Sequence, residues 1–167
     1  MTDYTHHYPS PLGEITMASD SIALTALWFD GQKYHADRPA PDHVERDLPV
    51  FREAARWLDL YFSGRVPDYT PPLAMRSTPF RKAVWEILLT IPYGATMTYG
   101  EIARLLARRR GMAKMSAQAV GGAVGHNAIA LIIPCHRVVG ADGSLTGYGG
   151  GLERKRWLLD LERRTAP

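Results

Sequence analysis

The sequence predicts an α+β protein, with a small strand-rich unit followed by a mostly helical one. Near the N-terminus, turn residues separate three short segments, residues 4–8, 14–19 and 23–29. In these segments apolar residues either alternate with polar ones or follow one another, which is typical of strands. Residues 50–62 then repeat apolar side chains at helical spacing, and Gly64 is the expected C-cap of this helix. The first part of the chain therefore predicts a small α+β unit.

Helices dominate the second part of the chain. Thr78 is the expected N-cap of one helix, with Pro79 at its first position. A second helix is expected to begin near Thr98 and to run until Gly111, and a third to follow Ser116 as its N-cap. Two helices that are joined by a short glycine-containing turn, with arginines beside it, are typical of a helix-turn-helix.

The distribution of charge separates the two parts. Residues 66–79 contain four prolines and are the expected linker, so we expect one domain over residues 1–75 and a second over residues 76–167. Residues 1–75 carry 6 Lys and Arg against 11 Asp and Glu, whereas residues 76–167 carry 14 against 6. The basic second domain is expected to meet a polyanion such as nucleic acid, although a solvated basic surface has the same imbalance.

Composition excludes several classes of protein. With 167 residues, 46% of them hydrophobic, and no apolar run long enough to cross a bilayer, the chain is expected to be a soluble globular protein without a membrane segment. Its N-terminus lacks the features of a secretory signal and its single cysteine cannot form an internal disulfide, so a cytoplasmic protein is expected. We expect no metal site and no cofactor, because one cysteine and six scattered histidines do not have metal-ligand spacing.

The third helix has an unusual composition. Residues 117–125 include three glycines, and each glycine lowers helix stability by ~1 kcal/mol relative to alanine. One explanation is that a DNA groove must approach the helix backbone closely. Packing against a neighbouring helix is the alternative explanation.

Cys135 is the only cysteine in the chain. A single cysteine is most often a small buried apolar residue. Here, however, His136 and Arg137 follow it directly, and positive neighbours lower the pKa of a thiol and increase its thiolate fraction. The glycine-rich segment 140–156 leaves space and backbone N–H groups for a flat polar ligand. The residues by themselves therefore predict a cysteine nucleophile beside a pair of nucleic-acid-binding helices.

Several longer motifs resemble one family of DNA-repair proteins. The motif IPCHRVVG, preceded by GHN and followed by GSLTGYGGG, resembles the O6-alkylguanine-DNA alkyltransferases, also called methylated-DNA–protein-cysteine methyltransferases. The similarity extends over nearly the whole chain, through SPLGEITMAS, TPFRKAVWEILLTIPYGATMTYGEIA and RKRWLLDLE. The PCHR tetrapeptide in this setting is a highly specific signal.

The resemblance implies a ribonuclease-H-like N-terminal α/β domain and a C-terminal domain with a winged helix-turn-helix-like fold. It also implies that O6-alkylguanine is flipped out of double-stranded DNA and that Cys135 takes the alkyl group in one irreversible displacement, so that each molecule reacts once. O4-alkylthymine is a second candidate substrate. The expected form is a monomer.

The resemblance also implies roles for individual residues. His136 is expected to take the thiol proton through water, and Glu162 to orient His136. Asn127 is expected to brace the active-site turn, with a helix C-cap as its structural alternative. The expected substrate-binding residues are Tyr99, whose alternative is a core aromatic, and Val138, Tyr148 and Gly149. The expected DNA-binding residues are Ser116, Ala117, Gln118, Ala119, Gly121, Gly122 and Arg137.

Two residues depart from the family pattern. Gln118 stands where the family usually has an arginine that fills the space left by the flipped base, and Ala128 stands where a proline commonly follows the asparagine. Glutamine can still hydrogen-bond to the unpaired base. The segment LARRRGMAKM between the DNA-binding helices is longer than usual and is expected to supply part of the missing charge.

Two other functions are open at this point. A non-enzymatic protein that flags alkylated bases for another pathway would lack the cysteine, so Cys135 argues against this function, whereas Gln118 keeps it open. An unrelated cysteine hydrolase would need an oxyanion hole, which the sequence does not reveal, and would leave the basic helix pair unexplained.

Overall fold

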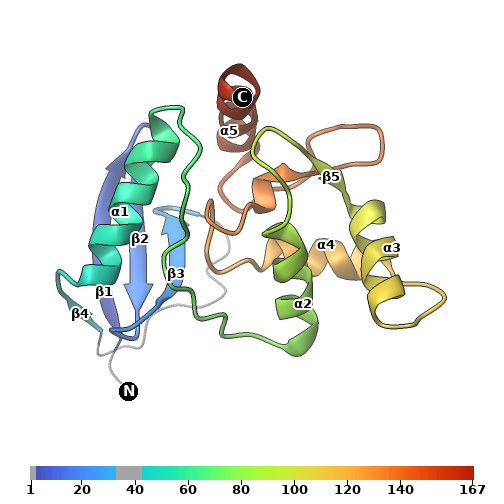
Figure 1. The fold of residues 1–167 in the computed structure, drawn as a ribbon, viewed down its shortest axis with the longest axis horizontal. Helices are drawn as coiled ribbons and strands as arrows, with labels where there is room; N and C mark the ends of the chain where they lie inside the picture. The colour runs from blue at the N-terminus through green and yellow to red at the C-terminus, as the bar shows by residue number, and fades with distance from the viewer. Residues whose placement is uncertain (1–2, 33–42) are drawn as a thin grey trace.

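The computed structural model describes residues 3–32 and 43–167 of the chain and has the predicted α+β architecture (Figure 1). In chain order its elements are β1 (Tyr4–Ser10), β2 (Gly13–Ser19), β3 (Leu24–Phe29), β4 (Val44–Glu45), α1 (Pro49–Phe62), α2 (Pro79–Leu88), β5 (Met97–Thr98), α3 (Tyr99–Arg109), α4 (Ala117–Gly125), a 3-10 turn (Cys135–Arg137), β6 (Val138–Val139) and α5 (Leu152–Thr165). In Figure 1 the sheet with α1 forms one side of the molecule and α2, α3 and α4 form the other, with α5 between them at the top of the view.

The N-terminal sheet has the strand order β3-β2-β1-β4. β1 and β2 form an antiparallel hairpin in which Ser10 pairs with Gly13, and β3 continues the antiparallel pairing with an irregularity beside Ser19. β4 pairs with β1 in parallel. The three predicted strands are confirmed, and β1 continues beyond the expected residue 8 to Ser10.

Helix α1 packs on this sheet and contacts β1, β2 and β3. Its residues Phe51, Leu58 and Tyr61 are fully buried, as the helical spacing predicts. Ser63, rather than the expected Gly64, is the C-cap, and Gly64 follows it in the left-handed region at φ +82. Glycine adopts this conformation without the steric cost of a side chain, which explains its place directly after the helix.

The helices of the second half begin at the predicted caps. The Thr78 hydroxyl accepts a hydrogen bond from the backbone N–H of Arg81 at the start of α2, and Thr98 forms a capping box with Glu101 at the start of α3. Ser116 accepts an equivalent hydrogen bond at the start of α4. Because α3 and α4 pack against each other, they form the predicted helix pair.

The outer edge of β3 joins the two halves of the chain. The backbone N–H of Leu27 donates to the carbonyl of Ala128 (2.9 Å), and the N–H of Ala130 donates to the carbonyl of Leu27 (3.0 Å). Leu24 pairs in the same way with the segment around Leu73. The edge of the sheet is therefore covered. The segment that leads to Cys135 is anchored on the N-terminal sheet.

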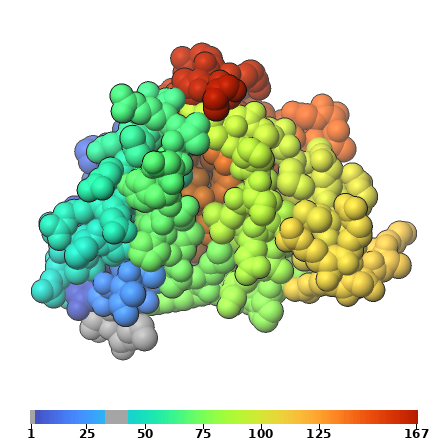
Figure 2. Space-filling model, in the orientation of Figure 1, coloured from blue at the N-terminus to red at the C-terminus, as the bar shows by residue number. Residues whose placement is uncertain are grey.

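The chain segment around residue 135 is recessed. In the space-filling view, this orange segment lies at the bottom of a hollow between the green and yellow-green surfaces (Figure 2). In the described part of the chain, no helix is both long enough and apolar enough to cross a membrane.

Candidate active site

Cys135 opens a 3-10 turn that runs to Arg137 and follows Pro134. The backbone N–H of Arg137 donates to the carbonyl of Pro134 (3.0 Å) and closes the turn. Successive side chains on a 3-10 turn are about 120° apart, whereas on a strand they alternate between opposite faces. The turn therefore allows Cys135 and His136 to face neighbouring parts of one site.

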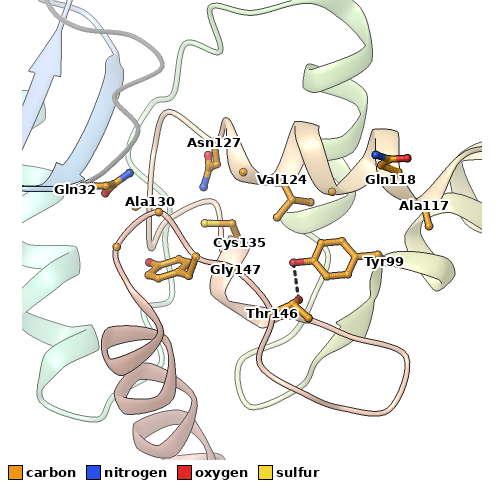
Figure 3. A pocket seen from close by; sticks show the side chains of 15 residues that line it. Gln32, Tyr99, Ala117, Gln118, Val124, Asn127, Ala130, Cys135, Thr146 and Gly147 are labelled. Atoms are coloured by element: carbon orange, nitrogen blue, oxygen red, sulfur yellow. Dashed lines mark hydrogen bonds between the residues drawn. The ribbon is translucent and has the colours of Figure 1, made fainter.

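The Cys135 side chain lines a pocket of about 700 Å³ (Figure 3). Figure 3 shows its sulfur beside the amide of Asn127, with Tyr99 and Gln118 farther along the pocket. The pocket brings together the following predicted site residues: Tyr99, Ala117, Gln118, Gly121, Asn127, Cys135, Tyr148 and Gly149. A volume of this size suits a small-molecule ligand or one flipped base.

His136 and Glu162 form a buried hydrogen-bonded pair. Nε2 of His136 lies 2.5 Å from Oε2 of Glu162, and the two side chains are 0% and 1% exposed. Burial lowers the pKa of His136, and the carboxylate only partly opposes this effect, so the imidazole is neutral at pH 7 and donates its Nε2 proton to Glu162. Nδ1 then carries a lone pair, and it is a buried atom with no hydrogen-bond partner among the described residues. The pair can therefore act as a general base.

Arg137 completes this buried cluster, which corrects the expectation that it contacts DNA. Its Nε donates to Oε1 of Glu162 (2.8 Å) and its Nη1 donates to the carbonyl of Ile91 (2.7 Å). Burial by itself would raise the pKa of Glu162, but the hydrogen bonds from His136 and Arg137 and the charge of Arg137 outweigh it and lower that pKa to about 2. The guanidinium is committed to the carboxylate and is not available at the surface.

Asn127 holds the turn that precedes Cys135. Its Nδ2 donates to the carbonyl of Ile133 (2.8 Å) and its Oδ1 accepts from the N–H of Ile129 (3.1 Å). Between them, Leu131 adopts a positive φ of 69°, a conformation that is uncommon for residues other than glycine. His126 is the C-cap of α4, so the alternative interpretation of Asn127 as that cap is wrong.

Lys155 is a buried cation beside the cysteine. Its Nζ donates to the carbonyls of Val138 (2.6 Å) and Thr146 (2.8 Å), and burial lowers its pKa to about 8. Burial raises the pKa of the Cys135 thiol, while a hydrogen bond from Asn127 and the charge of Lys155 oppose that rise. The sequence did not single out Lys155, because a lysine within RKR is most simply a surface charge.

Replacing Lys155 with methionine is expected to raise the pH midpoint of Cys135 reactivity by about one unit, because the thiolate loses a neighbouring cation. The rate of alkylation by iodoacetamide, measured between pH 6 and 10, reports this midpoint directly, since the chain has one cysteine. The exposed Lys82→Met variant in α2 is the control and should behave as the unsubstituted protein. An unchanged midpoint in the Lys155 variant would contradict this electrostatic role.

Two tyrosines lie on the pocket wall. The Tyr148 hydroxyl is buried and has no hydrogen-bond partner among the described residues. The Tyr99 hydroxyl accepts a hydrogen bond from Oγ1 of Thr146 (3.1 Å), which Figure 3 shows as a dashed line. Tyr99 is half-buried on the pocket wall, so it is more than a core aromatic. The Tyr99 hydroxyl is therefore placed to meet polar atoms of a bound group, whereas Tyr148 lines the pocket with its ring.

Gly149 and Val138 are placed differently from each other. Gly149 lines the pocket, and a side chain there would come within 3.0 Å of the Gln32 amide nitrogen. Gln32 follows β3 and also lines the pocket, although no local sequence signal marked it. Val138 is not part of the pocket lining: its N–H donates to the carbonyl of Cys135 and its carbonyl accepts from Lys155. The expected contact between Val138 and a substrate is therefore not supported by its position.

Two of the three glycines of α4 face open space. A side chain at Gly122 or Gly125 would meet no atom within 4 Å, and one at Gly121 would meet only the ring of Tyr99, at 3.8 Å. Packing against a neighbouring helix therefore does not account for Gly122 or Gly125, whereas Gly121 faces Tyr99, the first residue of α3. The other predicted DNA-binding residues of this region are all exposed: Ser116, Ala117, Gln118 and Ala119.

Comparison with known proteins identifies the relatives of this chain. It is 47% identical over 158 residues to the methylated-DNA–protein-cysteine methyltransferase of Mycobacterium tuberculosis, covering 95% of this chain and 91% of the relative. It is 42% identical over 162 residues to the protein of the same name from Haemophilus influenzae, covering 96% and 86%.

Solved structures give the same result. The crystal structure of Mycobacterium tuberculosis O6-methylguanine methyltransferase superposes with a TM-score of 0.83 at 45% identity, covering 99% of this chain and 95% of that one. The structure of the Mycobacterium tuberculosis protein in complex with DNA gives a TM-score of 0.80 at 44% identity, covering 100% and 96%. Residues 4–75 match the ribonuclease-like domain of 6-O-methylguanine DNA methyltransferase, and residues 79–164 match its DNA binding domain. The chain belongs to the 6-O-methylguanine DNA methyltransferase family.

Proposed function

We propose that this chain repairs DNA by transferring the methyl group of O6-methylguanine to Cys135, once per protein molecule. Its relatives are named as methyltransferases that act on methylated DNA and a protein cysteine, and Cys135 is the only cysteine here. The observation that carries the proposal is the position of Cys135 on the pocket wall. His136, the next residue in the chain, forms the buried pair with Glu162.

The reaction is one displacement at the methyl carbon. Nδ1 of the neutral His136 accepts the thiol proton through a bridging water, while Asn127 and Lys155 stabilise the thiolate. The C–S bond forms as the bond between the methyl carbon and O6 breaks, and the electron pair of that bond stays on the guanine, which takes up a proton. The products are S-methylcysteine and unmodified guanine. A thioether cannot ionise to a thiolate, so the protein is consumed by its reaction.

The pocket walls suit a base that has left the duplex. Tyr148 offers an aromatic surface, and Tyr99 offers a hydroxyl on the pocket wall. Gly149 leaves its backbone accessible to a flat ligand. Flipping costs a few kcal/mol and less for a poorly paired base, which favours the damaged guanine. O4-alkylthymine, with a similar alkylated oxygen, is a second candidate substrate.

The DNA surface is built from α4 and the basic segment before it. The glycines of α4 let a groove approach its backbone, and Gln118 stands at the pocket, where its amide can hydrogen-bond to the base left unpaired. Between Glu101 and Asp142 the chain has no acidic residue. Five exposed cations lie in this interval next to α4, namely Arg104, Arg108, Arg109, Arg110 and Lys114. Such a surface favours contact with phosphates.

The chain is expected to act as a monomer in the cytoplasm, where bacterial and archaeal DNA is found. A non-enzymatic protein that only binds alkylated bases is the second candidate function. The absence of an arginine at position 118 favours it, because glutamine lacks the charge and the planar fork of arginine. The presence of Cys135 beside a general base argues against it.

Intact mass spectrometry tests the proposed function. The protein is incubated with a duplex that contains one O6-methylguanine, in parallel with the Cys135→Ala variant. The expected result is a mass increase of one methyl group in place of a hydrogen, located in the Cys135 peptide and absent from the variant.

An unmodified Cys135 in a protein that still binds the damaged duplex would contradict methyl transfer and favour the lesion-binding function. The Gln118→Arg variant then shows whether base flipping was the missing step. A duplex that contains ordinary guanine is the control for non-specific alkylation.

A further inference from the structure

The N-terminal unit contributes one side chain to the general-base pair. Tyr61 lies in the last turn of α1, is fully buried, and donates its hydroxyl proton to Oε2 of Glu162 at 2.7 Å. The same hydroxyl oxygen is 3.4 Å from Nε2 of His136. The Tyr61 ring also packs edge-on against the His136 ring, with 6.2 Å between the centroids and 77° between the planes. Tyr61 thus touches both members of the pair from the other half of the chain.

We propose that Tyr61 is a positioning residue for methyl transfer, which fixes the carboxylate oxygen that holds His136 in its reactive orientation. This inference rests on the proposed function of Cys135 and His136. Oε2 of Glu162 accepts from Tyr61, from His136 and, at 3.3 Å, from Nη2 of Arg137, while Oε1 accepts from Nε of Arg137 and from the N–H of Gly94 (3.0 Å). Donors hold both oxygens, so the carboxylate cannot rotate without breaking several hydrogen bonds.

The hydrogen bond from the Tyr61 hydroxyl also weakens the electrostatic stabilisation that Glu162 gives to a protonated His136. A carboxylate oxygen that accepts a second hydrogen bond attracts a proton on the imidazole less strongly. Removing the Tyr61 hydroxyl therefore favours the imidazolium form, in which Nδ1 carries a proton and cannot act as the base. Burial and Glu162 raise the pKa of Tyr61 far above its ordinary range, so Tyr61 stays a donor at all working pH values.

Other charged and titratable groups surround the pair, and a substitution at Tyr61 leaves them in the chain. Those that face Tyr61 or His136 are Arg137 and Cys135 from the 3-10 turn, Glu162 and Lys155 from α5, Tyr148 from the glycine-rich segment and Tyr93 from the loop before β5. Of these, Tyr93 offers a matched control. Its ring packs edge-on against that of Tyr61 at 5.9 Å, but its hydroxyl bonds to Oγ1 of Thr165 instead of Glu162.

The test compares Tyr61→Phe and Tyr93→Phe with the unsubstituted protein. The single-turnover rate of methyl transfer from an O6-methylguanine duplex is measured between pH 5.5 and 9, together with the Kd for an unmethylated duplex. For Tyr61→Phe we expect a rate about tenfold lower at pH 7 and an acid limb that moves to higher pH by about half a unit, with the Kd unchanged. Tyr93→Phe is expected to keep the rate and the profile.

Three outcomes would overturn the inference: an unchanged rate and profile in Tyr61→Phe, an equal decrease in both variants, or a lower rate with no shift of the acid limb. Absence of transfer in the unsubstituted protein would instead refute the proposed function. If Tyr61→Phe does not fold, 3-fluorotyrosine at position 61 replaces it. This residue keeps the shape and is a stronger donor, so the acid limb is expected to move to lower pH, and no movement would count against the inference.

Discussion

Replacing Glu162 with glutamine is expected to slow methyl transfer by about 100-fold and to lower the free energy of unfolding by about 3 kcal/mol. The kinetic effect follows from the histidine tautomer. Glu162 accepts the Nε2 proton of His136 and leaves Nδ1 with a lone pair. An amide in the same place can donate to Nε2, which moves the imidazole proton to Nδ1 and removes the base from the side of the thiol.

The effect on stability has a separate cause. The carboxylate is the counter-charge of the buried Arg137 guanidinium, and a buried cation that loses its partner costs about 3 to 5 kcal/mol. The Tyr61 hydroxyl also loses its acceptor, because the amide nitrogen takes the place of Oε2. Urea unfolding at pH 7 measures the change. The exposed Glu86→Gln variant in α2 is the control, and we expect it to be close to neutral.

The pH dependence of unfolding distinguishes this cause from a general packing defect. The pKa of Glu162 is about 2 in the folded protein and 4.5 ordinarily, so its stabilising contribution is complete above pH 4.5 and is lost as the pH falls toward 2. The Gln variant lacks this group and is expected to lose less stability over that interval. Equal losses in the two proteins, or transfer at the unsubstituted rate, would refute the role assigned to Glu162.

Local features of the sequence were sufficient to predict most of the fold. The caps Thr78, Thr98 and Ser116 were predicted correctly because an N-cap depends on a side chain and a backbone N–H only two or three residues apart. The helical spacing of α1 and the turn between β1 and β2 are local in the same sense. In contrast, the pairing of β3 with the segment around Ala128 joins residues about a hundred positions apart, and no local pattern indicates it.

The active-site residues differ in the same way: those close together in the chain were predicted, and those brought in by tertiary packing were not predicted from local features. Cys135, His136 and Asn127 are close together in the chain and were identified with the family motif. Glu162 was paired with His136 only through the resemblance, because helix α5 brings it there. Arg137 and Lys155 have ordinary sequence contexts for surface charges, yet packing turns both inward. The direction of a long side chain is decided by tertiary contacts, so the expected DNA contact of Arg137 was wrong and Lys155 was not singled out.

Replacing Asn127 with alanine is expected to lower the free energy of unfolding by about 3 kcal/mol and the transfer rate by about 100-fold. The substitution leaves the buried N–H of Ile129 and the carbonyl of Ile133 without their side-chain partner, and each unsatisfied group costs about 1 to 3 kcal/mol. It also removes the support of Leu131 in its positive-φ conformation.

The cysteine is affected twice by the loss of Asn127. Its thiol pKa rises because the side chain of Asn127 no longer donates to it, and the turn that positions the sulfur is less constrained. The isosteric Asn127→Asp variant separates these effects: it keeps an acceptor for Ile129 but places a negative charge beside the sulfur, so alkylation by iodoacetamide should require a still higher pH than in the alanine variant. His126→Ala, at the exposed neighbouring cap, is the control for stability. If the alanine variant unfolds at the same urea concentration as the unsubstituted protein, the turn is held by its pairing with β3 and not by Asn127.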